Sequence, residues 1–475
     1  MTDLSPGKTV WSTAPIAWAG KRRLIGYDVL NDIADHVKSE MSSVELNVYT
    51  TQPSWCSYEG VTCGNITGTP SYASIVDIRL ESLGLTGILP SSIGSFISLT
   101  HLSLKHNRIA GNIPASITAL KALQVLELSA NRLTGSIPSN VNEMSSLTHL
   151  SLNRNSLTGT IPPAIGRMMG MMYVELSRNL LHGEIPSAVG GMLSLRTLYL
   201  DGNSLSGNIP ESMSELGLLQ ILDVDHNKLT GTIPSSLGGL VGLQDLYLGF
   251  NGFTGSIPLS FGGLISLQNL LLSHNSFSGS IPSSICDLKF LEQLYLESNN
   301  LTGTIPAELG QLILIKHLIM RSNSLSGTIP SSINQLESLI ELDIGLNSLS
   351  GTIPSSIGSL KLLESLHLNS NKLGGTIPST IGGFESITLL HLRSNSLTGS
   401  IPSNMASLEW LYSLDLSGNH LTMGSLNTLP SSTFSDVTRN GDLTLFHNCF
   451  VYTTEHVRLE SVIASNCLPK GQLLH

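Results

Sequence analysis

The sequence predicts an α/β solenoid built from coils of 24 residues. Asparagine recurs every 24 residues, fourteen times from Asn107 to Asn419, with no insertion and no deletion. Leucines precede each asparagine at strand spacing, and a Gly-x-Ile-Pro step follows it thirteen times. A strict period of this length is typical of stacked coils, each of which buries its apolar side chains against its neighbours.

The segment before each asparagine predicts a short β-strand. In one unit Leu198 and Leu200 flank Tyr199, and apolar residues that alternate in this way indicate a strand with one buried face. Gly202 and Asn203 then turn the chain. Because every coil adds one strand beside the last, we expect a parallel sheet with strands about 4.8 Å apart.

Each asparagine has a structural role of its own. It ends the strand, where backbone N–H and C=O groups turn inward without partners in the sheet. Its side chain offers two donors and an acceptor, so it can satisfy these groups from inside the coil. Replacing one with leucine is expected to leave buried polar groups unpaired, at about 1–3 kcal/mol.

The second half of each coil reads Leu-Thr/Ser-Gly-x-Ile-Pro, as in Leu229 to Pro234. Gly231 permits an unusual backbone turn, and Pro234 fixes φ. The hydroxyl residues around the glycine, such as Thr230 and Thr232, are expected to face outward and stack into a regular array. Such arrays resemble ice-binding surfaces, which makes ice binding one alternative function.

These units resemble the plant-type leucine-rich repeat over about residues 73–430, although Leu83 stands in the asparagine position of the first coil. The resemblance implies a right-handed superhelix of about 15–16 coils with a concave parallel β-sheet, capped at both ends. The family includes ectodomains of receptor-like kinases, receptor-like proteins and polygalacturonase-inhibiting proteins. Trp55 to Cys63 is similar to its N-terminal cap, with Tyr58 in place of the usual tryptophan.

Three regions follow from this organisation: residues 1–72 with the N-terminal cap, the repeats of 73–430, and a C-terminal strand and cap in 431–475. We expect residues 1–20 to be disordered, and apolar spacing predicts a cap helix over 30–44. Five cysteines predict one disulfide in each cap and one buried thiol: Cys56 with Cys63, Cys449 with Cys467, and Cys286 alone.

Composition narrows the partners and the compartment. The net charge is −10 with no basic run, which argues against nucleic acid, and no apolar run is long enough to span a membrane. The cap cysteines and the sequons at Asn65 and Asn300 favour an extracellular or cell-surface location. Residues 1–30 lack the apolar core of a secretory signal. Either the chain is incomplete, or its start was mis-assigned, or the protein is intracellular, and we favour the first two.

Candidate ligand residues come from the strand positions that should face solvent, at −7, −6, −4, −2 and −1 relative to each asparagine. A middle patch combines aromatic and acidic residues, which suits a peptide or protein ligand, with a co-receptor as a further partner. The alternative is that tyrosine suits strands and the acids only solubilise the surface. The middle patch comprises Tyr199, Asp201, Asp223, Asp225, Asp245, Tyr247, Phe250, Tyr295 and Glu297.

A second cluster follows in one column of the sheet. Asp343, His367, His391 and Asp415 occupy the −4 position of four successive coils, so the imidazoles should touch and a carboxylate should flank each. A solvated polar ladder is the reading we favour. Coupling of ligand binding to acidity through the histidines is the first alternative, and a transition metal is the second. We predict no resident metal and no cofactor.

The sequence therefore predicts a recognition module in signalling or defence, rather than an enzyme. It carries no nucleophile elbow, phosphate loop, zinc-protease motif or kinase signature. The runner-up is a secreted defence protein like the polygalacturonase inhibitors. A surface adhesion or scaffold role, or ice binding, comes third.

Overall fold

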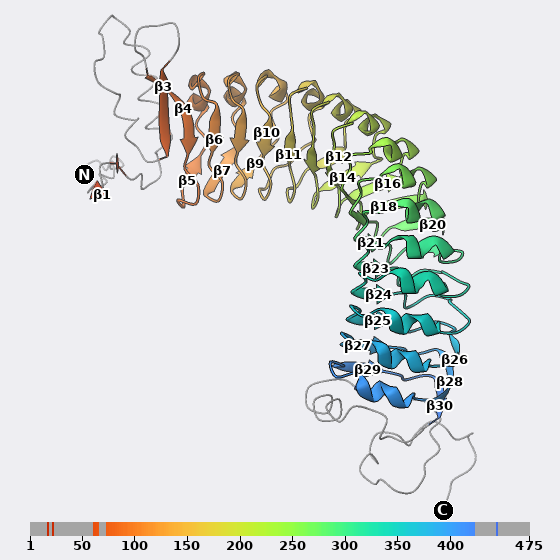
Figure 1. Ribbon diagram of the computed structural model, residues 1–475. Helices are drawn as coiled ribbons and strands as arrows, with labels where there is room; N and C mark the ends of the chain where they lie inside the picture. The colour runs from red at the N-terminus through yellow and green to blue at the C-terminus, as the bar shows by residue number, and fades with distance from the viewer. Residues whose placement is uncertain (1–16, 19–20, 23–59, 66–72, 423–442, 445–475) are drawn as a thin grey trace, which may run out of the picture. The chain divides into compact units, whose positions relative to one another are not determined.

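The computed structural model describes residues 17–18, 21–22, 60–65, 73–422 and 443–444 (Figure 1). The chain divides into an N-terminal unit, residues 1–181, and a C-terminal unit, residues 182–475. Several predictions fall outside the described residues: the disordered start, the cap helix over 30–44, Cys56, Cys449, Cys467 and most of the C-terminal cap. Those predictions, and the three region boundaries, stay predictions.

A first sheet runs through each unit and contains the predicted strands. In the N-terminal unit β3 pairs antiparallel with β4, and parallel strands follow, each paired with the next along the chain. Its strands are β3 (Val61–Asn65), β4 (Ala73–Arg79), β6 (His101–Ser103), β8 (Val125–Glu127), β10 (His149–Ser151) and β11 (Tyr173–Glu175). A separate antiparallel pair joins β1 (Ala17–Trp18) to β2 (Lys21–Arg22).

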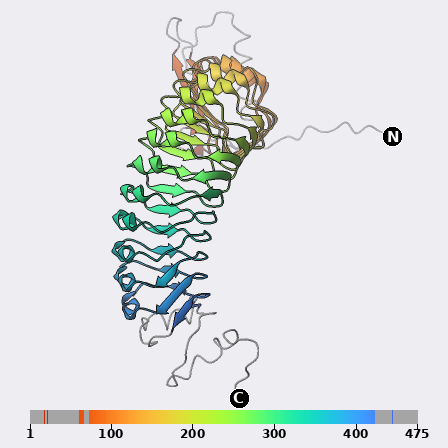
Figure 2. The same ribbon diagram turned by 90° about the vertical axis from the view of Figure 1, so that its right-hand side faces the viewer.

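The C-terminal unit continues the same pattern, and Figure 2 shows its strands stacked one after another. Each strand pairs in parallel with the next, 24 residues later as Leu198 does with Leu222, except that β29 and β31 pair across 29 residues, as Leu414 does with Leu443. The strands are β13 (Thr197–Tyr199), β15 (Ile221–Asp223), β17 (Asp245–Tyr247), β19 (Asn269–Leu271), β21 (Gln293–Tyr295), β23 (His317–Ile319), β24 (Glu341–Asp343), β25 (Ser365–His367), β27 (Leu389–His391), β29 (Ser413–Asp415) and β31 (Leu443–Thr444).

The predicted solenoid of strands and helices is confirmed. The helical segment of each coil is a 3₁₀ helix, which is wound more tightly than the α-helix that the term α/β implies. A proline precedes each of these helices except η4, and the short run before the next strand leaves no room for a longer helix. In the part of the chain that the structure describes, no helix is long and apolar enough to cross a membrane. In the C-terminal unit these helices lie on the side away from the first sheet (Figure 1).

The bounds of the helices follow the repeat. They are η2 (Ser91–Ser95), η3 (Ala115–Ala119), η4 (Val141–Glu143) and η5 (Pro163–Arg167) in the N-terminal unit. The C-terminal unit has η6 (Ser187–Gly191), η7 (Glu211–Glu215), η8 (Ser235–Gly239), η9 (Leu259–Gly263), η10 (Ser283–Asp287), η11 (Ala307–Gln311), η12 (Ser331–Gln335), η13 (Ser355–Ser359), η14 (Ser379–Gly383) and η15 (Ser403–Ser407).

A second set of strands, which the sequence analysis did not predict, forms where the Thr/Ser-Gly segment of one coil pairs with the same segment of the next coil. Partners here are 22 residues apart, as in Thr230 with Gly252. The strands are β5 (Thr86–Ile88), β7 (Arg108–Asn112) and β9 (Arg132–Thr134); β12 (His182–Glu184), β14 (Ser204–Gly207), β16 (Lys228–Gly231), β18 (Gly252–Ser256), β20 (Ser276–Ser280) and β22 (Asn300–Thr302); β26 (Gly374–Thr376), β28 (Ser396–Ser400) and β30 (His420–Thr422). Thr230 and Thr232 are exposed there, and ice binding stays a prediction.

The core lies between the first sheet and the helices of each unit. Leu198 and Leu200 are both buried, as the alternation predicted, and so is the isoleucine of each Gly-x-Ile-Pro step. Phe253, Phe261 and Phe277 are the largest fully buried side chains of the C-terminal unit. Cys286 is also buried and free, and burial raises its pKa to about 11, so it packs as a small apolar residue.

The asparagine column forms the hydrogen-bonded ladder that the sequence predicted. Oδ1 of Asn299 accepts from the backbone N–H of Phe277, 3.0 Å away in the preceding coil. Its Nδ2 donates to the carbonyls of Leu272, Leu296 and Glu297 at 3.0, 3.1 and 3.3 Å. The same pattern recurs at Asn227, Asn251 and Asn395. Each asparagine therefore joins two coils as well as ending its own strand.

Candidate functional site

The −4 positions of the C-terminal unit form one continuous column across the first sheet. Successive strands are in register, so each member faces the next: Tyr199, Asp223, Tyr247, Leu271, Tyr295, Ile319, Asp343, His367, His391 and Asp415. Residues at −5 and −3 point into the core, whereas those at −4 lie on the outer face. The two predicted clusters therefore belong to one surface.

The tyrosines of the middle patch are half-buried rather than exposed. The Tyr247 hydroxyl donates to Oδ1 of Asp245 at 3.3 Å, and Asp245 also accepts from Asn269. Burial, followed by the nearby Asp245 carboxylate, raises the pKa of Tyr247 well above its usual value. Burial likewise raises the pKa of Tyr295, next to Glu341 and Glu297. The Tyr247 phenol is therefore held in place before any ligand arrives.

Phe250 belongs to a different column, the −1 position at the end of the strand. Its ring stacks between His226 and His274, with centroid distances of 4.1 and 4.2 Å. All three residues have positive φ, from 48° to 52°, which is rare for such side chains. Phe250 is 44% exposed, so the stack offers an aromatic edge to a ligand.

The acids at −2 differ in how well the protein satisfies them. One oxygen of Asp225 contacts Nδ1 of His226 at 2.7 Å, whereas its Oδ1 is buried without a hydrogen-bond partner. Oε2 of Glu297 is also buried without a partner. Asp201 and Asp223 lie on the same outer face. Unsatisfied carboxylate oxygens are costly when buried, which makes this part of the surface receptive to donors.

A cavity of about 470 Å³ joins the two predicted clusters. Tyr295 and Glu297 of the middle patch line it, together with Asp343, His367 and His391. Asp415 does not. The remaining lining residues are Ile319, Arg321, Glu341, Gly345, Leu346 and Asn369. The volume is within the range of small-ligand sites, so this cavity is the centre of the candidate site.

Asp343 is the most buried ionisable group of the cavity, at 8% exposed. Its Oδ1 accepts from the Gly345 N–H at 3.0 Å. Its Oδ2 lies 3.7 Å from Nε of Arg321, too far for a hydrogen bond. Burial raises the pKa of Asp343 above its usual value, although the Gly345 N–H, His367 and Arg321 oppose this.

The two histidines touch, as the sequence predicted. Their rings meet edge to face with centroids 4.7 Å apart. The hydroxyl of Ser365 lies 2.7 Å from Nε2 of His367, and the hydroxyl of Ser413 lies 2.9 Å from Nε2 of His391. Asp415 accepts from the N–H and hydroxyl of Ser417 at 3.0 and 2.6 Å.

This geometry bears on the metal alternative. Within the described ranges, no group of three or more histidine, cysteine, aspartate or glutamate side chains could hold a metal ion. Two of the nitrogens that a metal would need already have serine hydroxyls within hydrogen-bond distance. Coupling of binding to acidity stays a prediction.

The buried Asp343 makes a prediction about stability. A raised pKa means that the folded protein binds this proton more tightly than the unfolded chain does. Its contribution to stability is therefore greatest at low pH and is lost as pH rises from the ordinary aspartate value through the raised one. Asp343→Asn removes the buried charge but keeps an oxygen for the Gly345 N–H. We expect its melting temperature, relative to the wild type, to be higher at about pH 7 than at about pH 3.5. A relative decrease at neutral pH would contradict this.

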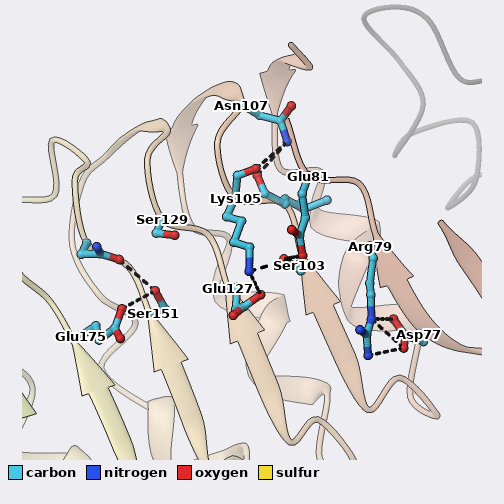
Figure 3. A network of polar contacts seen from close by, with 12 residues as sticks. Asp77, Arg79, Glu81, Ser103, Lys105, Asn107, Glu127, Ser129, Ser151 and Glu175 are labelled. Carbon is cyan, nitrogen blue, oxygen red and sulfur yellow. Dashed lines mark hydrogen bonds and ion pairs between the residues drawn. The ribbon is translucent and has the colours of Figure 1, made fainter. Parts of the chain in front are cut away.

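The outer face of the N-terminal unit contrasts with the cavity, because its charges are paired (Figure 3). Lys105 lies 3.1 Å from Glu127 and 3.5 Å from Glu81, and Ser103 donates to Glu81 at 2.8 Å. Burial raises the pKa of Glu127, but hydrogen bonds from Ser103 and Lys105 outweigh it, and the pKa lies below its usual value. The carboxylates drawn there already have donors.

Sequence reasoning missed several residues of the cavity. Arg321 was visible in the −2 column, and Glu341 occupies −6, but neither was selected. The signal that could have found the cavity is Gly345: a missing side chain between polar neighbours leaves a depression. The histidines that stack on Phe250 were also missed, because their contact depends on the unusual φ at −1.

Comparisons with known proteins agree on the repeat. A family model described as Leucine rich repeat matches residues 145–205, 194–253, 241–301 and 363–421. A second model, also described as Leucine Rich Repeat, matches residues 98–120, 122–144, 314–336 and 338–360. Together they cover more than half of the chain. Among curated protein sequences no match is found.

Solved structures with the same fold include plant receptors. One is a plant peptide hormone receptor, RGFR1, in complex with RGF2 (32% identity, 83% of this chain and 72% of that one, TM-score 0.67). A TDR receptor shares 32% identity over 78% of this chain and 68% of that one (TM-score 0.69). A third is the ectodomain of the membrane receptor kinase GASSHO1/SCHENGEN3 from Arabidopsis thaliana with CASPARIAN STRIP INTEGRITY FACTOR 2 (32%, 77% and 49%, TM-score 0.64). This chain spans about half the length of that ectodomain.

Proposed function

Since the chain belongs to the leucine-rich-repeat family, with repeats of the plant type, we propose that it is a non-enzymatic recognition module that binds a peptide on the outer face of its first sheet. The observation that carries the proposal is the cavity of about 470 Å³, which continues the aromatic and acidic column of the C-terminal unit. Similar chains in solved structures include plant receptors, and RGFR1 is named as a peptide hormone receptor in complex with RGF2.

The surface suits a peptide for three physical reasons. The first sheet offers a long row of outward side chains, which an extended ligand can contact one strand after another. Tyr247 is half-buried and its hydroxyl is already held by Asp245, so binding costs little entropy for this side chain. The acids Asp201, Asp223 and Asp225 favour a ligand with a basic segment and increase its rate of association.

Location and modification complete the proposal. We place the module outside the cell or at its surface, with a co-receptor or membrane-bound partner carrying any signal onward. The two cap disulfides and glycosylation at Asn65 and Asn300 belong to the same proposal. Asn300 supports it because the side chain is exposed on β22. The polygalacturonase-inhibitor alternative remains a prediction, which a pectinase inhibition assay tests.

A peptide display selection tests the proposed function. We expect immobilised wild-type protein to enrich a peptide whose affinity decreases about tenfold or more on Tyr295→Ala, since buried aromatic residues dominate such interfaces. Tyr173→Ala is the matched control, because Tyr173 lies on the first sheet of the N-terminal unit and does not line the cavity. Calorimetry with the selected peptide gives the affinities. No enrichment, or equal loss in both variants, would contradict the proposal.

A further inference from the structure

The cavity contains a buried carboxylate that the protein itself does not fully satisfy. Asp343 is 8% exposed, and its one hydrogen bond, from the Gly345 N–H, uses Oδ1. Oδ2 lies 3.7 Å from Nε of Arg321, and His367 is the neighbour of Asp343 on the next strand. Asp415 lies three strands beyond Asp343 in the same column, outside the cavity. It accepts two hydrogen bonds, from the N–H and the hydroxyl of Ser417. A carboxylate oxygen that accepts no hydrogen bond from the protein can take a donor from a ligand, so Asp343 has an unused acceptor.

Gly345 lines the same cavity as Asp343 and places no side chain in it. A Cβ on Gly345 would come within 2.9 Å of Oδ1 of Asn369, closer than ordinary contact. Gly345 lines the cavity, at a φ that is not positive, so conformational freedom does not explain the glycine. It keeps open a volume next to an incompletely satisfied acid.

The rest of the lining has the chemistry of a site for a cation with an apolar stem. Glu297 and Glu341 add two carboxylates to that of Asp343, and Glu341 is 3.2 Å from Nδ1 of His317. Ile319 and Leu346 offer apolar surface, and Tyr295 offers an aromatic ring. Arginine and lysine combine a hydrocarbon stem with a charged end, and both bind well beside aromatic rings.

We propose that this cavity receives one arginine or lysine side chain of the bound peptide, with Asp343 as its principal acceptor. The inference rests on the proposed function and specifies the ligand that its central subsite takes. Arg321 has a defined part in it: its half-exposed guanidinium forms an ion pair with Asp343 at 3.7 Å, which is longer than a hydrogen bond. The arriving cation competes with Arg321 for that carboxylate.

The opposite ligand, an anionic group held by Arg321, fits the cavity less well. Such a group would face the carboxylates of Asp343, Glu341 and Glu297, and like charges at close range oppose binding. The positive charge of Arg321 should weaken the binding of a cation and strengthen the binding of an anion. Removing its charge should strengthen the binding of a cation and weaken the binding of an anion.

Three short capped peptides test the inference: acetyl-Gly-Arg-Gly-amide, its citrulline analogue, which is neutral with nearly the same shape, and its glutamate analogue. Saturation-transfer NMR titrations against the full chain give their dissociation constants. We expect the arginine peptide to bind about tenfold more tightly than either analogue, as for a hydrogen bond to a charged group. Asp343→Asn should remove this preference, and Arg321→Gln should strengthen arginine binding about threefold or more.

Arg393→Gln is the matched control. Arg393 occupies the same −2 column, is exposed and lies outside the cavity, so its replacement changes net charge equally without changing arginine binding. Melting curves identify any variant that fails to fold. If Asp343→Asn fails to fold, the result for Arg321→Gln still tests the inference. Weaker arginine binding in Arg321→Gln, or an equal affinity for citrulline, would overturn the inference. If the display selection still yields a peptide with no basic residue, the proposed function stands and only this subsite fails.

Discussion

Asn299→Ala is expected to destabilise the C-terminal unit by about 3 kcal/mol or more. Its side chain makes four hydrogen bonds to backbone groups of two coils, and Asn299 is 8% exposed. Alanine would leave the Phe277 N–H and the Leu272 carbonyl without these partners. Because neighbouring coils stabilise each other, the loss should be felt along the unit as a lower urea midpoint.

The adjacent residue provides the control. Asn300 is exposed on β22, and its side chain bonds to nothing in the part of the chain that the structure describes. In protein produced without glycosylation, Asn300→Ala makes the same chemical change one position away, and we expect its free energy of unfolding to remain within about 0.5 kcal/mol of the wild type. Similar losses in both variants would show that the asparagine column does not hold the coils together.

Gly238→Ala is expected to have the second large effect. Gly238 is buried in η8, and a Cβ there would overlap the backbone carbonyl of Ser260 in the next coil. A carbonyl in a packed coil cannot rotate away as a side chain can, so the two coils must separate. We expect a cost of about 2–3 kcal/mol, measured by urea unfolding.

Gly239→Ala, the very next residue, should behave in the opposite way. A Cβ at Gly239 meets nothing within 4 Å, and its φ is not positive. Alanine there reduces the freedom of the unfolded chain, which should stabilise the protein by about 0.4–1 kcal/mol. If both variants lose equal stability, close packing of the 3₁₀ helices is not the reason for the glycine at 238.

Much of the fold could be predicted because its determinants are local and repeated. Leu198 and Leu200 alternate with Tyr199, so their burial follows from strand periodicity in any coil. The role of the asparagines followed from their hydrogen-bonding groups and their place at the strand end. The second set of strands was not predictable in the same way: its 22-residue register depends on how far each coil is displaced over the next.

The candidate site was only partly visible in the sequence. The columns placed Tyr295, Asp343, His367 and His391 on one face, and they share a cavity in the structure. The half-burial of the tyrosines, and the exclusion of Asp415 from the cavity, could not be read from the columns. They depend on the lengths and directions of neighbouring side chains.

The sequence by itself determined the solenoid, the register of the first sheet and which residues share its outer face. Those properties follow from a period that repeats the same local chemistry in every coil. Only the tertiary structure decided which groups on that face are satisfied. Asp343 accepts one hydrogen bond, from the Gly345 N–H, while Nε of Arg321 lies 3.7 Å from its other oxygen. The distance between Arg321 and Asp343 depends on how neighbouring coils pack, which residue types and spacing do not specify.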